Sequence, residues 1–281
     1  MNSTDCPQTP SRAALNQLKN NMIVFLHIPK TAGSTFQFIL NNNLGISHCH
    51  TNHSHKEIFT QADLRFARMV FPGLKGIAGH NLVDPLALRV PNPFYMTFLR
   101  EPVARVLSSY QERFLVKQRL GQPTCDFAEA LRTTGELQNL HVKLMAGGEN
   151  LDKAKRFLER CDFVGLTEKF DLSLRLLDRL YPEKLDLKYP MRRVAMDNTI
   201  KKSIEKDSVL MEMAREYNRL DIELYSFATN EVFPKLLEKA GIKASDPVPS
   251  YVTELRVPNF RDRLNRFYNL SVYRQLSKLR R

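Results

Sequence analysis

The sequence predicts an α/β protein of three layers, with helices on both sides of a central and mainly parallel sheet. Short apolar runs of strand length alternate along the chain with segments of helical periodicity, which is typical of α/β folds. A polar loop follows the first apolar run and leads directly into a helix, as in sheets that bind ligands at their strand ends. The length of 281 residues favours one such domain with insertions over two independent units.

The first strand and the first helix enclose the polar loop. The apolar run Met22–His27 is bounded by Pro29 and fits a buried parallel strand. After the loop, Thr35–Leu40 predicts a helix that ends in the turn-forming segment Asn41–Gly45. The loop therefore lies at the carboxyl end of the strand, where open α/β sheets bind their ligands.

A later strand, Phe94–Leu99, precedes a second well-marked helix. Pro102 suits the first turn of this helix, and Val103, Val106 and Tyr110 recur at helical spacing. The other expected elements are a helix near 61–69, a strand ending at 78–80, a strand at 163–166 followed by a helix through 180, and helices near 207–225 and 230–240.

The composition indicates a globular protein that attracts polyanions. Lysine and arginine outnumber aspartate and glutamate by 42 to 30, which gives a formal net charge of +12. Nucleic acid, an anionic membrane and an acidic polysaccharide all fit this charge. Nucleic acid is not expected, because the chain has no recognition motif and no strand that alternates aromatic and basic residues.

The sequence shows no targeting or membrane-spanning segment, so we expect a cytoplasmic protein unless an anchor precedes this chain. The longest apolar runs have only strand length, and the first 21 residues contain no apolar signal region. The cysteines have no CxxC spacing, and we expect them to be mostly reduced thiols. They are Cys6, Cys49, Cys125 and Cys161.

The loop from Pro29 to Thr35 has the residue types of an anion-binding site. A helix that begins here presents unpaired N–H groups, and Gly33 permits close approach of the backbone to an anion. Ser34 and Thr35 add hydroxyl donors, and Lys30 adds a mobile positive charge. The lysine precedes the glycine, which is the reverse of the GK[ST] order of nucleotide kinases.

The string from His27 to Phe36 strongly resembles the phosphosulfate loop of the carbohydrate sulfotransferases that use 3′-phosphoadenosine 5′-phosphosulfate (PAPS). It is most similar to the subgroup of heparan sulfate 2-O and 6-O and uronyl 2-O enzymes. The resemblance implies a P-loop-like fold and PAPS as co-substrate. We expect no metal, because the sulfuryl group carries only one negative charge. The resemblance also implies that the donor contacts Lys30, Thr31, Ala32, Gly33, Ser34 and Thr35.

A second anion site is expected at the end of the strand Phe94–Leu99. Arg100 follows this strand and Ser108 lies about two helical turns further on, so a guanidinium and a hydroxyl can converge on one phosphate. The segment from Thr97 to Tyr110 resembles the family's 3′-phosphate motif, although Glu101 replaces the usual aspartate. Weaker similarity extends the match over roughly residues 22–235, through stretches at 138–147, 163–170 and 218–225.

Transfer of a sulfuryl group to a hydroxyl requires a base and a cation. We expect Lys30 to stabilise the leaving 5′-phosphate oxygen. We expect His80 to be the general base, because it closes a short strand on the same edge of the sheet and a neutral imidazole can accept a proton. The family's similar Gly-His position supports this choice, and Glu101 and His141 are the reserve candidates.

Three other features leave alternatives open. The stretch from His48 to His55 fits a solvated or cleft-lining loop, a transition-metal site or an acceptor contact. Basic residues in a loop-like region fit either a solvated face or contact with an acidic saccharide; they are Lys188, Arg192, Arg193, Lys201 and Lys202. Basic C-terminal residues fit a soluble tail or peripheral membrane contact; they are Arg256, Arg261, Arg263, Arg266, Arg274, Lys278, Arg280 and Arg281.

We therefore expect a polar segment at 1–20, a sulfotransferase domain at 21–242, and a linker with a basic C-terminal tail at 243–281. The expected partner is a carbohydrate acceptor that can be anionic. The competing functions are a non-catalytic polyanion-binding protein on the same scaffold, favoured if His80 faces away from the donor, and a nucleotide-dependent kinase.

Overall fold

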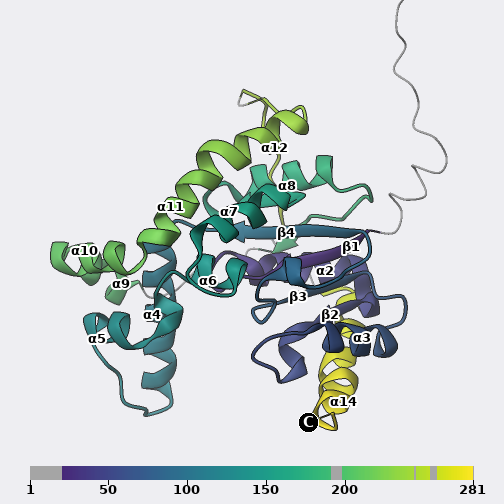
Figure 1. The fold of residues 1–281 in the computed structure, drawn as a ribbon, viewed down its shortest axis with the longest axis horizontal. Coiled ribbons are helices and arrows are strands. Elements are labelled where there is room, and N and C mark those ends of the chain that lie inside the picture. The colour runs from purple at the N-terminus through teal and green to yellow at the C-terminus, as the bar shows by residue number, and fades with distance from the viewer. Residues whose placement is uncertain (1–20, 191–197, 244, 254–257, 281) are drawn as a thin grey trace, which may run out of the picture.

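The computed structural model describes residues 21–190, 198–243, 245–253 and 258–280 (Figure 1). Its centre is a five-stranded parallel sheet with the order β2-β3-β1-β4-β5, which confirms the predicted α/β class. The strands are β1 (Met22–Leu26), β2 (His48–His50), β3 (Gly76–Gly79), β4 (Pro93–Leu99) and β5 (Phe163–Leu166). A separate parallel pair joins β6 (Tyr189–Pro190) and β7 (Val252–Thr253).

The middle strand, β1, is buried along its whole length. It pairs with β3 on one side and with β4 on the other, and Leu26 is aligned with both Gly79 and Thr97. A continuous apolar sequence is what a parallel strand covered on both faces requires. The register also brings the residues after β1, β3 and β4 to the same edge of the sheet.

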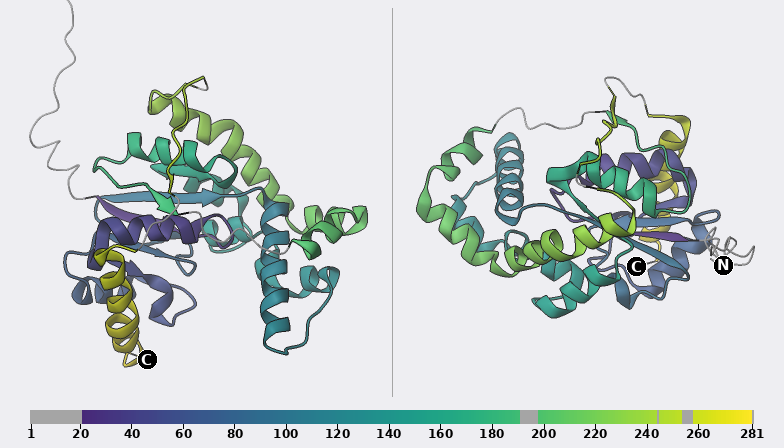
Figure 2. Two further views of the ribbon diagram at one scale, coloured as in Figure 1. Left: turned by 180° about the vertical axis from the view of Figure 1, so that it is seen from behind. Right: turned by 90° about the horizontal axis from the view of Figure 1, so that it is seen from above.

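Helices cover both faces of this sheet. Seen from behind, α2 and the C-terminal helix lie in front of the strands (Figure 2, left). The helices are α2 (Gly33–Leu44), α3 (Gln61–Val70), α4 (Pro102–Arg119), α5 (Phe127–Thr133), α6 (Leu140–Ala146), α7 (Leu151–Arg160), α8 (Phe170–Leu180), α9 (Thr199–Glu205), α10 (Ser208–Tyr217), α11 (Arg219–Phe227), α12 (Phe233–Lys239), α13 (Phe260–Phe267) and α14 (Arg274–Lys278).

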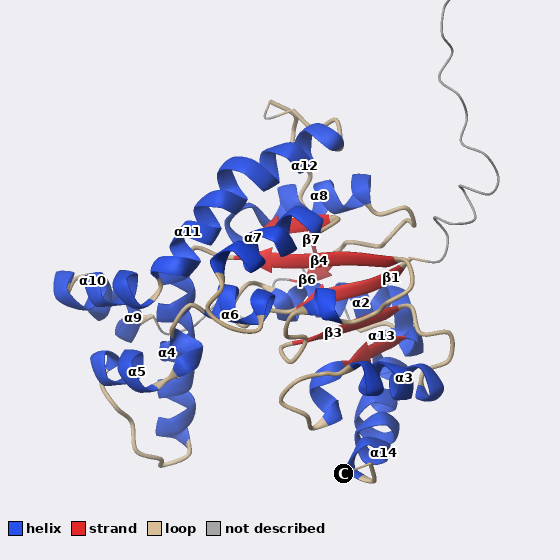
Figure 3. Ribbon diagram, viewed as in Figure 1, coloured by secondary structure: helices blue, strands red, loops and turns tan. Residues whose placement is uncertain are grey.

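Four of these helices, α4, α5, α9 and α10, stand beyond the carboxyl ends of the strands (Figure 3). They have an apolar core of their own, in which Val106, Tyr110 and Leu131 of α4 and α5 meet Ile204 and Ala214 of α9 and α10. The helix α4 starts directly after β4 and therefore connects the sheet to this group.

The helix expected at 207–225 is wrong as a single element, because it is broken at Asn218. The buried side-chain amide of Asn218 donates to the carbonyl oxygens of Leu137 and Ala214, and its oxygen accepts the N–H of Asn139. A side chain that binds backbone groups in this way competes with helical hydrogen bonding. Beyond the break, α11 continues through a π-helical turn (Ala228–Val232) into α12.

The C-terminal residues, expected as a linker and a tail, form a helix that packs against α2 and the edge of the sheet. The helix runs from α13 through a π-helical turn (Tyr268–Tyr273) into α14, and its inner face is buried. The buried side chains recur every three or four residues: Asp262, Asn265, Asn269, Tyr273 and Ser277.

This inner face is polar because it covers strand β2, which was expected as part of a loop. The amide of Asn269 accepts the N–H of His50 and donates to the carbonyl of His48, and Asn265 donates to the same carbonyl. The helix thereby satisfies the free edge of the sheet, which would otherwise expose unpaired backbone groups.

Some of the residues singled out in the sequence lie outside the described ranges. They are the segment 1–20 with Cys6, and Arg192, Arg193, Arg256 and Arg281. Among the residues that the structure does describe, no helix has the length and apolar character needed to cross a bilayer.

Candidate active site

A pocket of about 420 Å³ lies at the carboxyl ends of β1, β3 and β4, and it gathers almost every residue that the sequence predicted for the site. These residues come from three different segments of the chain, as expected for a site at the strand ends of an α/β sheet. The predicted residues that line it are Lys30, Ala32, Gly33, Ser34, Thr35, His80, Arg100 and Ser108, and they are joined there by His27, Pro29, Glu112 and Thr167.

The loop between β1 and α2 has an unusual backbone. Lys30 and Ala32 both have positive φ angles, 70° and 61°, although neither is glycine. Left-handed residues alternating with right-handed ones turn successive N–H groups toward one side and form an anion-binding concavity. Gly33 and Ser34 follow as the first helical residues, whose N–H groups have no carbonyl partner one turn earlier. The loop is therefore built to receive an anion.

Gly33 has a second function that the sequence did not indicate. A Cβ atom at this position would lie 1.7 Å from Nε2 of His27, so the residue must be glycine for the imidazole to pack against the loop. Burial lowers the pKa of His27 well below its ordinary value, and the neighbouring His80 lowers it further. His27 is therefore neutral at pH 7.

Thr31 is the one predicted loop residue whose side chain does not line the pocket. It is fully buried, and its hydroxyl donates to the carbonyl oxygen of Ile28 at 2.9 Å. This bond closes the loop on itself and keeps Thr31 out of the pocket, unlike the donor contact that was expected of it.

The cations of the pocket are held by neighbouring groups. Nζ of Lys30 lies 3.2 Å from Oε2 of Glu112, which projects from α4 one turn after Ser108. The guanidinium of Arg100 donates to the carbonyl oxygen of Lys30 at 3.2 Å and so ties the end of β4 to the loop. Burial lowers the pKa of Arg100, but an arginine remains charged at neutral pH.

His80 is held in one tautomer. Its Nδ1 lies 2.5 Å from the carbonyl oxygen of His27, and because a carbonyl can only accept, Nδ1 carries the proton. Its backbone N–H donates to the side chain of Asn52 at 2.8 Å. Burial lowers the pKa of His80, so the ring is neutral at pH 7 and Nε2 has a free lone pair.

A comparison with protein-family models identifies the family of the chain. The model of the sulfotransferase family matches residues 15–228, which is more than half of the chain. The chain belongs to the sulfotransferase family. A search of the curated proteins returned no match. The family match supports sulfuryl transfer in general and does not distinguish the heparan sulfate and uronyl subgroup, which stays a prediction.

The two reserve bases of this sulfotransferase do not line the 420 Å³ pocket at the strand ends. The carboxylate of Glu101 caps α4 and accepts the N–H groups of Val103 and Ala104 at 3.0 and 2.6 Å. His141 is fully buried, 3.7 Å from the carboxylate of Asp221, and burial lowers its pKa to about 4. Neither Glu101 nor His141 is therefore placed to accept a proton from a ligand in this pocket.

Three residues of the pocket were missed by the sequence analysis. His27 ends the first apolar run, and a polar side chain at the end of a buried strand was the available signal. Glu112 lies one helical turn beyond Ser108, so the same spacing argument could have found it. Thr167 follows β5, and its hydroxyl donates to the carbonyl of Leu99 at 2.9 Å. The available signal was its place directly after the strand expected at 163–166, in a stretch that resembles the family.

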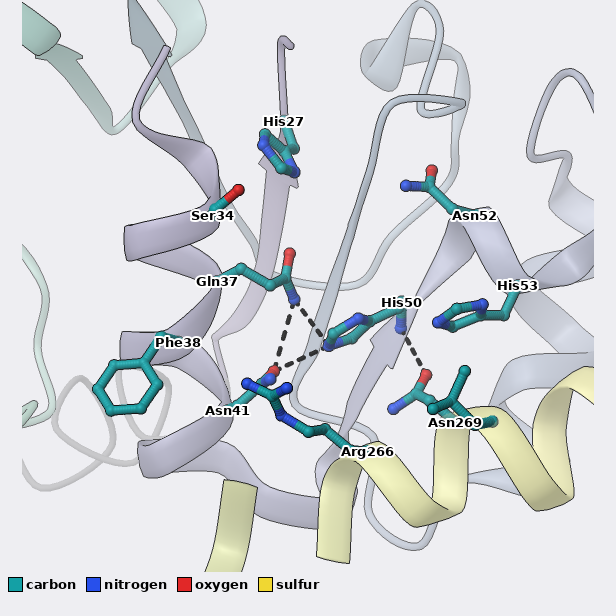
Figure 4. Close-up of a pocket in the computed structure, with 11 residues that line it drawn as sticks. His27, Ser34, Gln37, Phe38, Asn41, His50, Asn52, His53, Arg266 and Asn269 are labelled. Carbon is teal, nitrogen blue, oxygen red and sulfur yellow. Dashed lines mark hydrogen bonds between the residues drawn. The ribbon is translucent and has the colours of Figure 1, made fainter. Parts of the chain in front are cut away.

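A second pocket of about 350 Å³ shares His27 and Ser34 with the first (Figure 4). It lies between α2, β2 and the C-terminal helix. The remaining residues that line it are Gln37, Phe38, Asn41, His50, Asn52, His53, Arg266, Asn269 and Leu270.

The histidine-rich stretch belongs to this second pocket. His48 and His50 form β2, and the rings of His50 and His53 are stacked with their centroids 5.8 Å apart. The ring of His48 is fully buried and bonds to Asn41 at 2.9 Å. Within the part of the chain that the structure describes, no group of three or more histidine, cysteine or acidic side chains is arranged to hold a metal ion.

The described cysteines, Cys49, Cys125 and Cys161, are free thiols. Burial raises the pKa of Cys49 and of Cys161, so both thiols are protonated at neutral pH. They contribute to the apolar core and not to either pocket.

Proposed function

We propose that this sulfotransferase transfers a sulfuryl group from PAPS to a hydroxyl of a carbohydrate, on either a glycan or a glycolipid. One observation carries the proposal: an anion-binding loop, a second cationic group and an oriented imidazole line the same pocket. PAPS has two separate anionic ends, the phosphosulfate and the 3′-phosphate. A kinase has no need of the second anion site, and the order of Lys30 and Gly33 also disfavours one.

The residues present fit this donor. The N–H groups of Gly33 and Ser34 would hold the phosphosulfate, together with the ammonium of Lys30. Arg100 and Ser108 would hold the 3′-phosphate. Lys30 would exchange Glu112 for the phosphate, which requires only a rotation of its flexible side chain.

When bound, PAPS supplies an activated sulfuryl group. His80 Nε2 accepts the proton of the acceptor hydroxyl as the oxygen bonds to sulfur. Lys30 stabilises the charge that develops on the 5′-phosphate oxygen as its bond to sulfur breaks. The carbonyl of His27 stabilises the imidazolium, since it keeps accepting from Nδ1 throughout the step.

The position of His80 also bears on the non-catalytic alternative. That alternative was favoured if His80 faced away from the donor pocket, and His80 lines this pocket together with Lys30. A protein that only bound polyanions would have no use for a neutral imidazole in one tautomer.

The cytoplasmic location expected from the sequence stays a prediction.

Peripheral membrane contact, one of the two alternatives for the basic C-terminal residues, stays untested, and the surface of the C-terminal helix is compatible with it. Its outer side carries the exposed apolar residues Phe267, Leu270 and Leu279. All charged side chains described on this helix are basic except for the buried Asp262. Anionic lipid is the partner that such a surface complements.

The decisive experiment is calorimetry with 3′-phosphoadenosine 5′-phosphate, the product nucleotide, against ATP. We expect the bisphosphate to bind at least about tenfold more tightly, because only it fills both anion sites. Tight binding of ATP without binding of the bisphosphate would contradict the proposal.

Two variants test the assigned roles with labelled PAPS. Lys30→Ala should lose transfer, and His80→Ala should lose about 10²–10⁴-fold in rate while it keeps nucleotide affinity. The wild-type rate should fall as the pH drops through the lowered pKa of His80, below 6.5, because the protonated ring cannot accept a proton. Full activity of His80→Ala would show that another group is the base.

A further inference from the structure

The second pocket differs from the donor pocket in charge. The charged residues that line the donor pocket are Lys30, Arg100 and Glu112. Among the residues that the structure describes, Arg266 is the only lysine, arginine or acidic residue that lines the second pocket. Nε of Arg266 lies 2.8 Å from Oδ2 of Asp262, a fully buried carboxylate on the same helix. The positive charge at this pocket is therefore already balanced by the protein.

The imidazoles of the second pocket are neutral and fixed by a chain of hydrogen bonds. Asp262 accepts from Nδ2 of Asn41 at 3.0 Å, so the amide oxygen of Asn41 must face the other way. That oxygen lies 2.9 Å from Nδ1 of His48, which therefore carries a proton. Nε2 of His50 lies 2.8 Å from the same oxygen and 2.8 Å from the amide nitrogen of Gln37. Burial lowers the pKa of His50 to about 3, in agreement with a neutral ring.

Open hydrogen-bonding groups remain around this fixed framework. The side-chain oxygen of Gln37 points away from His50, toward His27 and Ser34 (Figure 4). The amide nitrogen of Asn52 and the hydroxyl of Ser34 also line the pocket. Leu270, 44% exposed, adds an apolar wall. Uncharged donors and acceptors next to an apolar surface are what a sugar ring requires.

The second pocket adjoins the donor pocket. His27 and Ser34 line both pockets, and the rings of His27 and His80 have centroids 4.2 Å apart. Asn52 lines the second pocket and also holds the backbone of His80. A ring seated here would therefore lie beside His27, next to the pocket that His80 lines.

We propose that the second pocket binds the acceptor as an uncharged sugar ring, with one wall supplied by the C-terminal helix. The inference rests on the proposed function and narrows its acceptor to neutral sugars. A uronate would bring a carboxylate to a pocket whose one cation is paired, and an unpaired charge in a partly buried site is costly. The net charge of +12 of the whole chain thus does not imply an anionic acceptor in this pocket.

The test compares octyl β-D-glucopyranoside with octyl β-D-glucuronide, which differ only at C6. Binding to the full chain is measured by saturation-transfer NMR in the presence of the bisphosphate nucleotide. We expect the glucoside to bind at least about tenfold more tightly than the glucuronide. Failure of the glucoside to bind, or tighter binding of the glucuronide, would overturn the inference.

Pocket variants locate the binding. Gln37→Leu and Leu270→Ser should each weaken glucoside binding at least about fivefold while nucleotide affinity stays unchanged. Leu279→Ser is the matched control, because Leu279 is 83% exposed on the same C-terminal segment and does not line the pocket. Unchanged glucoside binding by both pocket variants would overturn the inference. Because Leu270 is exposed, its replacement leaves the core intact.

The outcome separates the inference from the proposed function. Nucleotide binding without glucoside binding overturns the inference and leaves sulfuryl transfer from PAPS intact. Glucoside binding that depends on Gln37 and Leu270, in a protein that does not bind the bisphosphate, supports the sugar pocket and contradicts PAPS as donor.

Discussion

At the scale of single residues, His27 connects more of the site than any group that the sequence pointed to. Its ring packs on Gly33, its carbonyl fixes the tautomer of His80, and it lines both pockets. The glycine of the anion loop is therefore needed for a side-chain contact as well as for approach of a ligand.

Replacement of Gly33 tests this contact. Gly33→Ala should lower the free energy of unfolding by about 1–3 kcal/mol, because a Cβ atom 1.7 Å from the ring of His27 forces the ring or the loop to move. Chemical denaturation measures the change, and calorimetry should show weaker nucleotide binding. Gly148→Ala is the matched control, since no atom lies within 4 Å of its added Cβ. Equal stability of the two variants would contradict this account of Gly33.

Glu112 places a negative charge in a pocket proposed for an anionic nucleotide. Glu112→Gln should tighten binding of the bisphosphate by about 3–10-fold, because it removes repulsion and frees Lys30 from its ion pair. The matched control is Glu223→Gln, which breaks the ion pair with Lys155 on the surface away from both pockets. Weaker nucleotide binding by Glu112→Gln would show that Glu112 helps to position Lys30 for the donor.

At the scale of elements, the C-terminal helix is part of the domain. Its inner asparagines bond to the backbone of the edge strand β2, and its outer side remains basic with scattered apolar residues. The pattern of apolar residues in the sequence therefore does not reveal which face of this helix is buried. The buried face is polar because it covers a sheet edge, whereas an ordinary surface helix buries its apolar face.

Asn269 is the residue on which this contact depends most directly. Asn269→Leu should destabilise the protein by about 2–4 kcal/mol, because the N–H of His50 loses its acceptor and the carbonyl of His48 loses the bond from the buried amide of Asn269. Urea denaturation measures the loss. Gln275→Leu, at an exposed position of the same helix, should change the stability by less than about 0.5 kcal/mol. A small effect at Asn269 would mean that the helix adds little to the edge strand.

At the scale of the whole molecule, the buried histidines make stability depend on pH. Burial lowers the pKa values of four histidines: His27, His48, His50 and His141. The pKa falls to about 3 for His50 and to about 4 for His141. In the unfolded chain these residues take up protons near pH 6.5, whereas the folded protein excludes the protons until a lower pH. Stability is therefore complete above about pH 6.5 and decreases as the pH falls.

We expect the free energy of unfolding to decrease by several kcal/mol between pH 7 and pH 5. Each excluded proton contributes about 1.4 kcal/mol per pH unit below 6.5. Urea denaturation at a series of pH values measures the slope, and His141→Gln should reduce it by about one proton. A free energy of unfolding that is constant from pH 7 to pH 5 would show that these histidines become protonated in the folded state.

The sequence by itself determined the fold class, the sulfotransferase family and most of the residues that line the pocket at the strand ends. It could do so because these signals are local: strand-length apolar runs, a loop of fixed spacing and a helix start after Arg100. Only the tertiary structure decided which side chains turn inward and where the helices end. The side chain of Thr31 turns inward within the loop. The helix break at Asn218 depends on contacts with residues about 80 positions away.

The second pocket, too, was decided by tertiary structure alone. It joins α2 and β2 to a helix more than 200 residues later, through bonds such as that from Asn41 to Asp262. No local pattern encodes a contact of this separation, because it depends on how the sheet edge and the C-terminal helix meet. The sequence thus specified the pocket that we assign to the donor, and packing between distant segments formed the pocket that we assign to the acceptor.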